Sequence, residues 1–232
     1  MIASPLSIEP QPDGRSCGPT CLHAVYRFHG VDLPLPELVD AIDQLELGGT
    51  LAVQLGTHAL QHGFDATVYT YNLQVFDPSW FHPGAAPLDA NLHAQRAAKD
   101  DARLHDATGR YLEFLRRGGQ VRHAPLSPGL LAQFLGDGLP ILTGLSATYL
   151  YDAKREVPED DTVDDLRGQP VGHFVVIHGI DLAKGVVQVA DPWPNSEGRV
   201  GTKTHPTWRV LTAIALGVLT YDANLLVLRR KT

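Results

Sequence analysis

The stretch QPDGRSCGPTCLHAVYRFHG, residues 11–30, decides the fold of the N-terminal part of the chain. It opens with turn formers and continues with apolar residues at steps of three and four, from Cys17 to Phe28. This spacing predicts a helix that begins at Cys17 and that Gly30 ends. Pro19 fits the first turn, where a missing N–H is harmless. Cys17 is therefore either a nucleophile at a helix start or a small buried residue.

The composition is that of a globular protein. The chain has 232 residues, is 44% hydrophobic and carries a formal net charge of −7. It has no basic run interleaved with aromatic residues, so we expect no nucleic-acid partner. The first residues lack a cationic segment followed by an apolar run, and no apolar run approaches about 18 residues. We therefore expect a cytoplasmic protein without a membrane span; the oligomeric state is unknown from the sequence.

The two cysteines, Cys17 and Cys21, lie four residues apart. A disulfide between them would bridge one helical turn with poorly aimed Cβ atoms. Two cysteines are also too few to staple a fold of this size, so reduced thiols are expected. His23 and His29 lie nearby, but no second closely spaced ligand pair follows, and we expect neither a metal nor a cofactor.

The rest of the chain mixes helical and extended patterns. Helices are predicted over 34–45, 51–63, 127–138 and 208–217, with one or two more within 88–119. Strands are predicted over 64–72, 139–151 and 223–230, and a hairpin over 171–181 and 185–194. Helices come first and most strands later, which indicates an α+β fold with N-terminal helices packed on a C-terminal antiparallel sheet. We expect a single domain over residues 1–232.

An acidic, turn-rich loop is predicted over residues 152–170, between two buried strands. It holds seven acidic and three basic residues. Loops of this length are often functional. If this one borders a cleft, it favours cationic substrate segments; otherwise it is a solvated loop.

A second candidate group lies in the predicted hairpin. His173 begins one apolar run, and the next run ends in Asp191-Pro192. If the two runs pair, His173 and Asp191 lie at the same open end of the hairpin. A carboxylate there can orient an imidazole toward a thiol, and the helix start stabilises a thiolate at Cys17. The alternatives are a structural cysteine and a simple Asp-Pro turn.

Gln11, six residues before Cys17, is the fourth candidate catalytic residue, because a side-chain amide near a nucleophile can donate a hydrogen bond to an oxyanion. The order Gln11, then CGPT at 17–20, then HFVV at 173–176, then ADP at 190–192 resembles the papain-like cysteine peptidases that process double-glycine leader peptides. That family includes the peptidase domains of bacteriocin-exporting ABC transporters.

The resemblance implies roles for four residues. Cys17 would be the nucleophile, His173 the general base and acid, Asp191 the orienting group and Gln11 an oxyanion donor. The reaction would be peptide-bond cleavage through a thioester. Against the family pattern, 75–127 is extra material, an insertion in this interpretation, and no transporter segment is present.

Other functions remain open from the sequence. The same triad suits an amidase or acyltransferase, and the same fold without turnover suits a peptide-binding module. A metal-bound or redox dithiol at Cys17 and Cys21 is a third alternative. Cys21 is expected in the core, and His178, an odd number of residues from His173, is expected on the opposite face of its strand.

Overall fold

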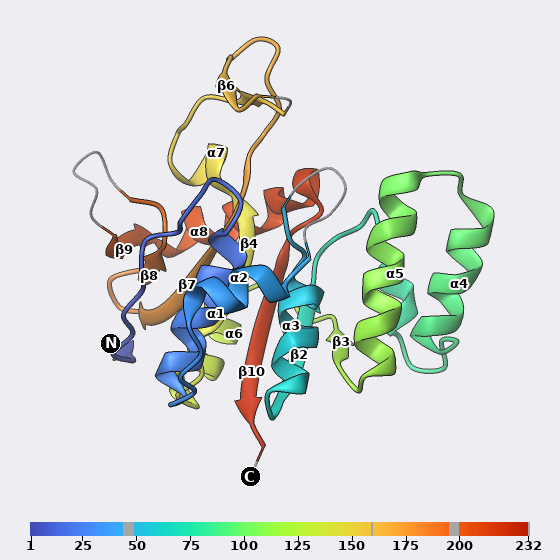
Figure 1. The fold of residues 1–232 in the computed structure, drawn as a ribbon. Helices are drawn as coiled ribbons and strands as arrows, with labels where there is room; N and C mark the ends of the chain where they lie inside the picture. The colour runs from blue at the N-terminus through green and yellow to red at the C-terminus, as the bar shows by residue number, and fades with distance from the viewer. Residues whose placement is uncertain (44–48, 159, 195–199, 232) are drawn as a thin grey trace.

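The computed structural model describes residues 1–43, 49–158, 160–194 and 200–231. Its centre is one sheet in which the strands follow the order β3-β2-β10-β4-β7-β8-β9, with β1 paired to the far end of β7 (Figure 1). The bounds are β1 Ile2–Ala3, β2 Phe64–Thr70, β3 Gln120–Arg122, β4 Ile141–Ser146, β7 Gly172–Asp181, β8 Val186–Asp191, β9 Gly201–Pro206 and β10 Asn224–Arg230. The β2-β3 pair is parallel and the other pairs of this sheet are antiparallel.

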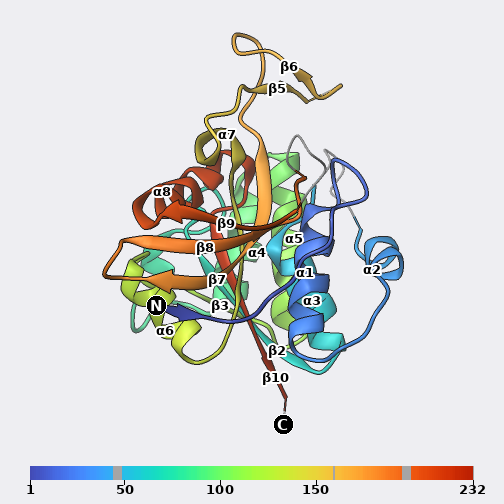
Figure 2. The same cartoon turned by 90° about the vertical axis from the view of Figure 1, so that its left-hand side faces the viewer.

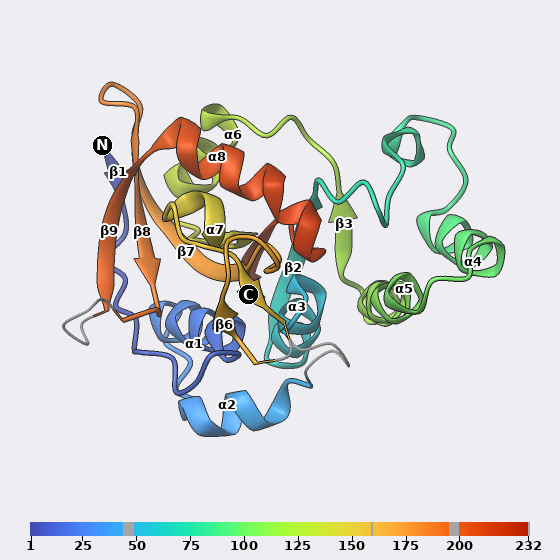
Figure 3. The same ribbon diagram turned by 90° about the horizontal axis from the view of Figure 1, so that it is seen from above.

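Helices cover both faces of the sheet (Figure 3). One face carries α1 Cys17–Phe28 and α3 Ala52–Gln61, with α2 Leu35–Ala41 outside α1 and with α4 Leu88–Ala98 and α5 Ala102–Arg116 beside α3. The other face carries α6 Pro128–Gly136, α7 Ala147–Leu150 and α8 Thr207–Leu216. The short 3₁₀ helices η1 Pro78–Phe81 and η2 Gly217–Thr220 lie in the connections. The α+β fold predicted from the sequence is confirmed.

Strand β7 shows why the sheet lies between two layers. Phe174 and Val176 belong to the hydrophobic cluster under α1 and α3, whereas Val175 and Ile177 belong to the cluster under α6 and α8. All four are buried, and burying a side chain of this size contributes roughly 1.5–3 kcal/mol. A strand buried on both faces gives a continuous apolar run in the sequence, as HFVVI does.

Helix α1 packs closely on β7. A Cβ on Gly18 would lie 3.3 Å from Leu55 and 3.4 Å from Phe174, so glycine lets the first turn approach the sheet. Gly30, in the left-handed region at φ +73°, follows the helix end as predicted. The start of α1 is thereby held against the strand that carries His173.

Three predictions about local structure were wrong. The strand expected over 139–151 ends at Ser146, because the Ser146 hydroxyl accepts the N–H of Tyr149 and caps α7. The helix expected over 34–45 ends at Ala41, and residues 44–45 lie outside the described residues. Strand β9 was missed because it alternates partly buried and exposed polar residues at the edge of the sheet.

The acidic segment 152–170 projects from the body of the molecule (Figure 2). It contains a small hairpin of β5 Glu156–Val157 and β6 Thr162–Val163. The Asp164 carboxylate binds within the segment, where it accepts the backbone N–H groups of Leu166 and Arg167 at 2.9 Å, whereas Asp152 pairs with Arg209 on α8 at 2.6 Å. In the described part of the chain, no helix is both long and apolar enough to cross a membrane.

Candidate active site

Cys17 is the first residue of α1 and is half-buried. The loop before it is held by Asp13, whose carboxylate accepts the Arg15 N–H at 2.7 Å and the Ser16 hydroxyl at 2.8 Å. The first N–H groups of a helix have no partner within the helix and point toward its start. The Cys17 sulfur therefore lies where backbone dipoles stabilise an anion.

His173 and Asp191 form a buried pair. The His173 Nε2 and the Asp191 Oδ1 are 2.9 Å apart, with 3% and 0% of the side chains exposed. Val176 pairs with Ala190 in the β7-β8 register, so His173 lies diagonally across from Asp191 at the open end of the hairpin. The prediction that the hairpin brings these two side chains together is confirmed.

The charge on His173 depends on its partners. Burial by itself lowers the pKa of a histidine, but the hydrogen bonds with Asp191 and Cys17 and the charges of both raise the pKa of His173 to about 9. Because Asp191 occupies Nε2, Nδ1 is the ring nitrogen left for the Cys17 side chain. A protonated ring beside the sulfur favours the thiolate.

Asp191 receives donors from several elements. Besides His173, its carboxylate accepts the Trp193 N–H at 2.8 Å, the Lys203 Nζ at 2.8 Å and the Tyr151 hydroxyl. Burial disfavours the charged form, yet His173, Lys203 and Tyr151 together hold the pKa of Asp191 well below its usual range. A carboxylate that stays ionised in the core is what keeps the neighbouring imidazole charged.

Tyr151 and Lys203 were missed in the sequence. Tyr151 is the last residue of the segment that was predicted as a buried strand, and Lys203 lies in the edge strand that the pattern did not reveal. The rings of Tyr151 and Trp193 stand edge-on to His173, at centroid distances of 6.4 and 5.9 Å. They shield the imidazole from solvent.

Gln11 lies beside this group through its backbone. Its N–H donates to the carbonyl of Pro192 at 3.1 Å, which ties the loop before Cys17 to the residues after Asp191. Its side-chain Nε2 donates to the carbonyl of Asp13 at 2.6 Å, and its Oε1 is buried without a partner among the described residues. The structure thus places Gln11, Cys17, His173 and Asp191 in one region.

Cys21 and His178 have other surroundings. Cys21 is buried, its Sγ lies 3.2 Å from the carbonyl oxygen of Phe174, and burial together with the neighbouring charges raises the pKa of its thiol. His178 contacts the Ser4 carbonyl at 2.9 Å and the Thr202 hydroxyl at 3.0 Å, so both ring nitrogens are occupied. Among the described residues, no group of three or more His, Cys, Asp and Glu side chains is arranged to hold a metal ion.

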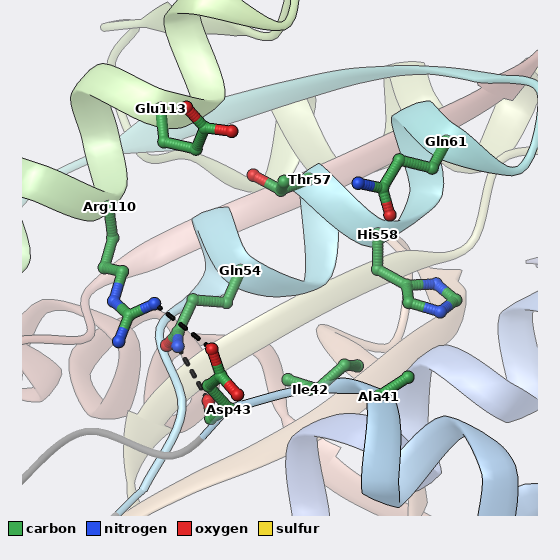
Figure 4. A pocket seen from close by; sticks show the side chains of 9 residues that line it. All are labelled: Ala41, Ile42, Asp43, Gln54, Thr57, His58, Gln61, Arg110 and Glu113. Atoms are coloured by element: carbon green, nitrogen blue, oxygen red, sulfur yellow. Dashed lines mark hydrogen bonds and ion pairs between the residues drawn. The ribbon is translucent and has the colours of Figure 1, made fainter.

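Two hollows are relevant to the position of the site. One, of about 280 Å³, is bounded by His173, Tyr151 and Trp193. The other, of about 140 Å³, lies between the end of α2, α3 and α5, where Arg110 pairs with Asp43 at 3.6 Å (Figure 4). The second hollow shares no lining residue with the group around Cys17, so the first is the hollow that belongs to the candidate site.

Comparisons with known proteins found a family model and similar folds. Residues 6–88 match the model of the Peptidase C39 family. A search of curated proteins found no match. Among solved structures, a C39-like peptidase from Bacillus anthracis is 14% identical with a TM-score of 0.51, over 99% of this chain and 100% of that one.

Two further structures are similar. The peptidase domain of Streptococcus ComA, a bifunctional ABC transporter of a quorum-sensing pathway, is 12% identical with a TM-score of 0.46, and both chains are covered fully. A double-glycine-motif protease of an AMS/PCAT transporter, in complex with the leader peptide, is 11% identical with a TM-score of 0.47, over 99% of this chain and 94% of that one.

The chain therefore has the papain-like α+β fold. Residues 6–88, which include Cys17, match the model of the Peptidase C39 family. The fold that the sequence motifs implied is confirmed, and the family model matches the segment that carries the CGPT motif. His173 and Asp191 lie outside the matched segment.

Proposed function

We propose that the protein is a cysteine peptidase that cleaves a peptide bond through a thioester on Cys17. The Cys17 sulfur attacks the carbonyl carbon, and the C–N bond breaks as His173 gives its proton to the leaving amine. Water, deprotonated by His173, then attacks the thioester and releases the acid and the free thiol. Asp191 fixes the ring so that Nδ1 faces the sulfur.

One observation carries this proposal. A buried imidazole lies between a carboxylate at 2.9 Å and the side chain of Cys17 at a helix start. An ion pair of thiolate and imidazolium suits this arrangement, because each charge stabilises the other and the imidazole is buried. The family match supplies the reaction class, since residues 6–88 match a peptidase family.

Gln11 is proposed as the oxyanion donor together with the backbone N–H of Cys17. An amide nitrogen has two N–H groups, and the Asp13 carbonyl takes one of them. The other remains for a developing oxyanion. Removing one such donor costs about 10²–10³-fold in rate, which is the expected effect of Gln11→Ala on turnover.

The remaining predictions belong to the same proposal. We propose one papain-like domain over residues 1–232, with 75–127 as an insertion, a peptide or protein substrate and a cytoplasmic location. An amidase or acyltransferase would use the same residues and would differ only in the acyl donor or acceptor. A peptide-binding module would keep the groove and lack the reactive thiolate.

The test is the pH dependence of Cys17 alkylation by iodoacetamide in the wild type and in His173→Ala. Trypsin releases both cysteines in one peptide, residues 16–27, and its fragment ions separate Cys17 from Cys21. Cys21 is an internal control, because it is fully buried. We expect a rate plateau at Cys17 well below about pH 8 in the wild type and its loss in the variant. A rate that rises only near pH 8.5 in both proteins contradicts the proposal.

A further inference from the structure

The hollow beside His173 has a defined place relative to the nucleophile. Its lining residues in the described part of the chain all lie between residues 147 and 203, and His173 forms one of its walls. Cys17 and the loop before it are not among these lining residues. In the proposed reaction His173 must reach the leaving nitrogen, so the segment that leaves passes on the His173 side of the sulfur.

The walls of this hollow are mainly apolar. Ala147, Val171 and Pro194 line it together with the rings of Tyr151 and Trp193. Trp193 keeps 46% of its surface exposed although its ring packs edge-on to His173, which leaves an aromatic surface free for a ligand. The volume of about 280 Å³ is at the small end of the roughly 300–1,000 Å³ of small-molecule sites, which suits one side chain and its backbone.

The cations at its rim are already paired. Lys203 binds the Asp191 carboxylate at 2.8 Å, and Lys154 lies 3.3 Å from the Asp165 carboxylate. An acidic side chain entering the hollow would have to compete with these carboxylates. An apolar or aromatic side chain would instead displace water from the rings of Tyr151 and Trp193.

We propose that this hollow binds the side chain of the first residue on the leaving-group side of the cleaved bond, and that it selects a large apolar or aromatic side chain. The inference rests on the proposed peptidase function. It adds a specificity site on the leaving-group side, formed by Tyr151, Val171 and Trp193 with the start of the acidic segment at its rim.

The experiment tests this site without knowledge of the acyl side of the substrate, because a simple ester supplies the acyl group. The Cys17 thiolate attacks p-nitrophenyl acetate, the C–O bond breaks, and p-nitrophenolate leaves an acetyl thioester on Cys17. An added amino-acid amide then attacks the thioester: its nitrogen forms the C–N bond, the C–S bond breaks, and His173 moves the amine proton to the sulfur. By microscopic reversibility, the attacking amine occupies the place of the leaving amine. Phenylalaninamide, leucinamide, glycinamide and glutamic acid amide are offered in pairs at equal concentration.

We expect the N-acetyl products of phenylalaninamide and leucinamide to exceed that of glycinamide about tenfold or more, with glutamic acid amide close to glycinamide. The variant Ala153→Trp fills the hollow from an exposed lining position, and it should bring the product ratio toward one. The ratio does not depend on how much enzyme is acylated. Ala85→Trp, at an exposed alanine in another loop, should keep the wild-type ratio.

The outcomes separate the two proposals. A p-nitrophenolate burst that needs Cys17, followed by equal yields of all the amides, overturns the specificity site and leaves the peptidase proposal standing. No burst above that of Cys17→Ser overturns the proposed function and, with it, this inference. If Ala153→Trp yields no product, Trp193→Ala replaces it, and a preference for phenylalaninamide that survives in that variant overturns the site.

Discussion

Two buried histidines in this protein have opposite charge preferences. His58 on α3 lies 2.8 Å from the Tyr26 hydroxyl and stacks on His62 at 4.0 Å between ring centroids. Burial, with a smaller effect from His62, lowers the pKa of His58 to about 4. At His173 burial acts in the same direction, but Asp191 and Cys17 reverse it and raise the pKa to about 9. The partner at hydrogen-bond distance, and not burial, decides which histidine is charged at neutral pH.

Removing the charge of Asp191 should have the largest effect on the reactivity of Cys17. His173 would then be, like His58, a buried histidine without a carboxylate partner. In Asp191→Asn, the pKa of His173 should fall below 7, and Cys17 alkylation at pH 7 should slow by about 10²–10⁴-fold. Ring-proton NMR titration and alkylation rates measure the two effects. Asp181→Asn, at the other end of the strand that carries His173 and paired with the largely exposed Lys184, is the matched control and should change neither. A His173 pKa that stays near 9 without the carboxylate contradicts this explanation.

The next largest effect is on the free energy of unfolding. His58 should affect it at acidic pH and His173 at alkaline pH. The folded pKa of His58 lies below the unfolded value of about 6.5, so its contribution is present above pH 6.5 and is lost as the pH falls toward 4. Through His58, the wild type should lose about 3 kcal/mol of unfolding free energy as the pH falls, and His58→Gln should not show this loss. Urea unfolding at a series of pH values measures it.

His173 supplies the comparison for the same series. Its folded pKa is raised, so its contribution is complete below pH 6.5 and is lost as the pH rises through about 9. His173→Ala should reduce the loss of unfolding free energy at alkaline pH and leave the loss at acidic pH unchanged. If His58→Gln reduces the alkaline loss of unfolding free energy, or His173→Ala reduces the acidic loss, the assignment of the two histidines is wrong.

A smaller effect is expected from Lys203. Its Nζ binds Asp191 at 2.8 Å while a third of the side chain is exposed, so solvent screening reduces its contribution. Lys203→Met should lower the unfolding free energy by about 1–2 kcal/mol. Lys184→Met removes a largely exposed lysine that lies 3.9 Å from the Asp181 carboxylate, and it should have no measurable effect. Equal effects in the two variants would show that burial of Asp191 adds nothing.

The smallest effect concerns His62. Its charge contributes less than burial to the low pKa of His58, so His62→Gln should raise that pKa by less than one unit. NMR titration of the His58 ring detects such a shift. A rise to the ordinary value of about 6.5 would mean that His62, and not burial, holds His58 neutral.

Local sequence predicted the elements that depend on local rules. The helix from Cys17 to its end at Gly30 follows from apolar spacing and from the conformational freedom of glycine. The pairing of His173 with Asp191 follows from a short hairpin, since two apolar runs joined by a short turn have few ways to pair. The edge strand at Lys203 escaped prediction because its polar residues give no apolar pattern, and the Ser146 cap escaped it because Ser146 lies inside an apolar run.

The sequence by itself determined the two strands of the hairpin, the helix that carries Cys17 and the match of residues 6–88 to a peptidase family model. Only the tertiary structure decided how Asp191 stays charged, because its donors Tyr151 and Lys203 come from separate elements that the sheet brings together. It also decided that Cys17 faces His173 while Cys21, one turn later, lies in the core. Side chains four residues apart lie on the same face of a helix, one turn from each other, and what each of them meets depends on packing against the sheet.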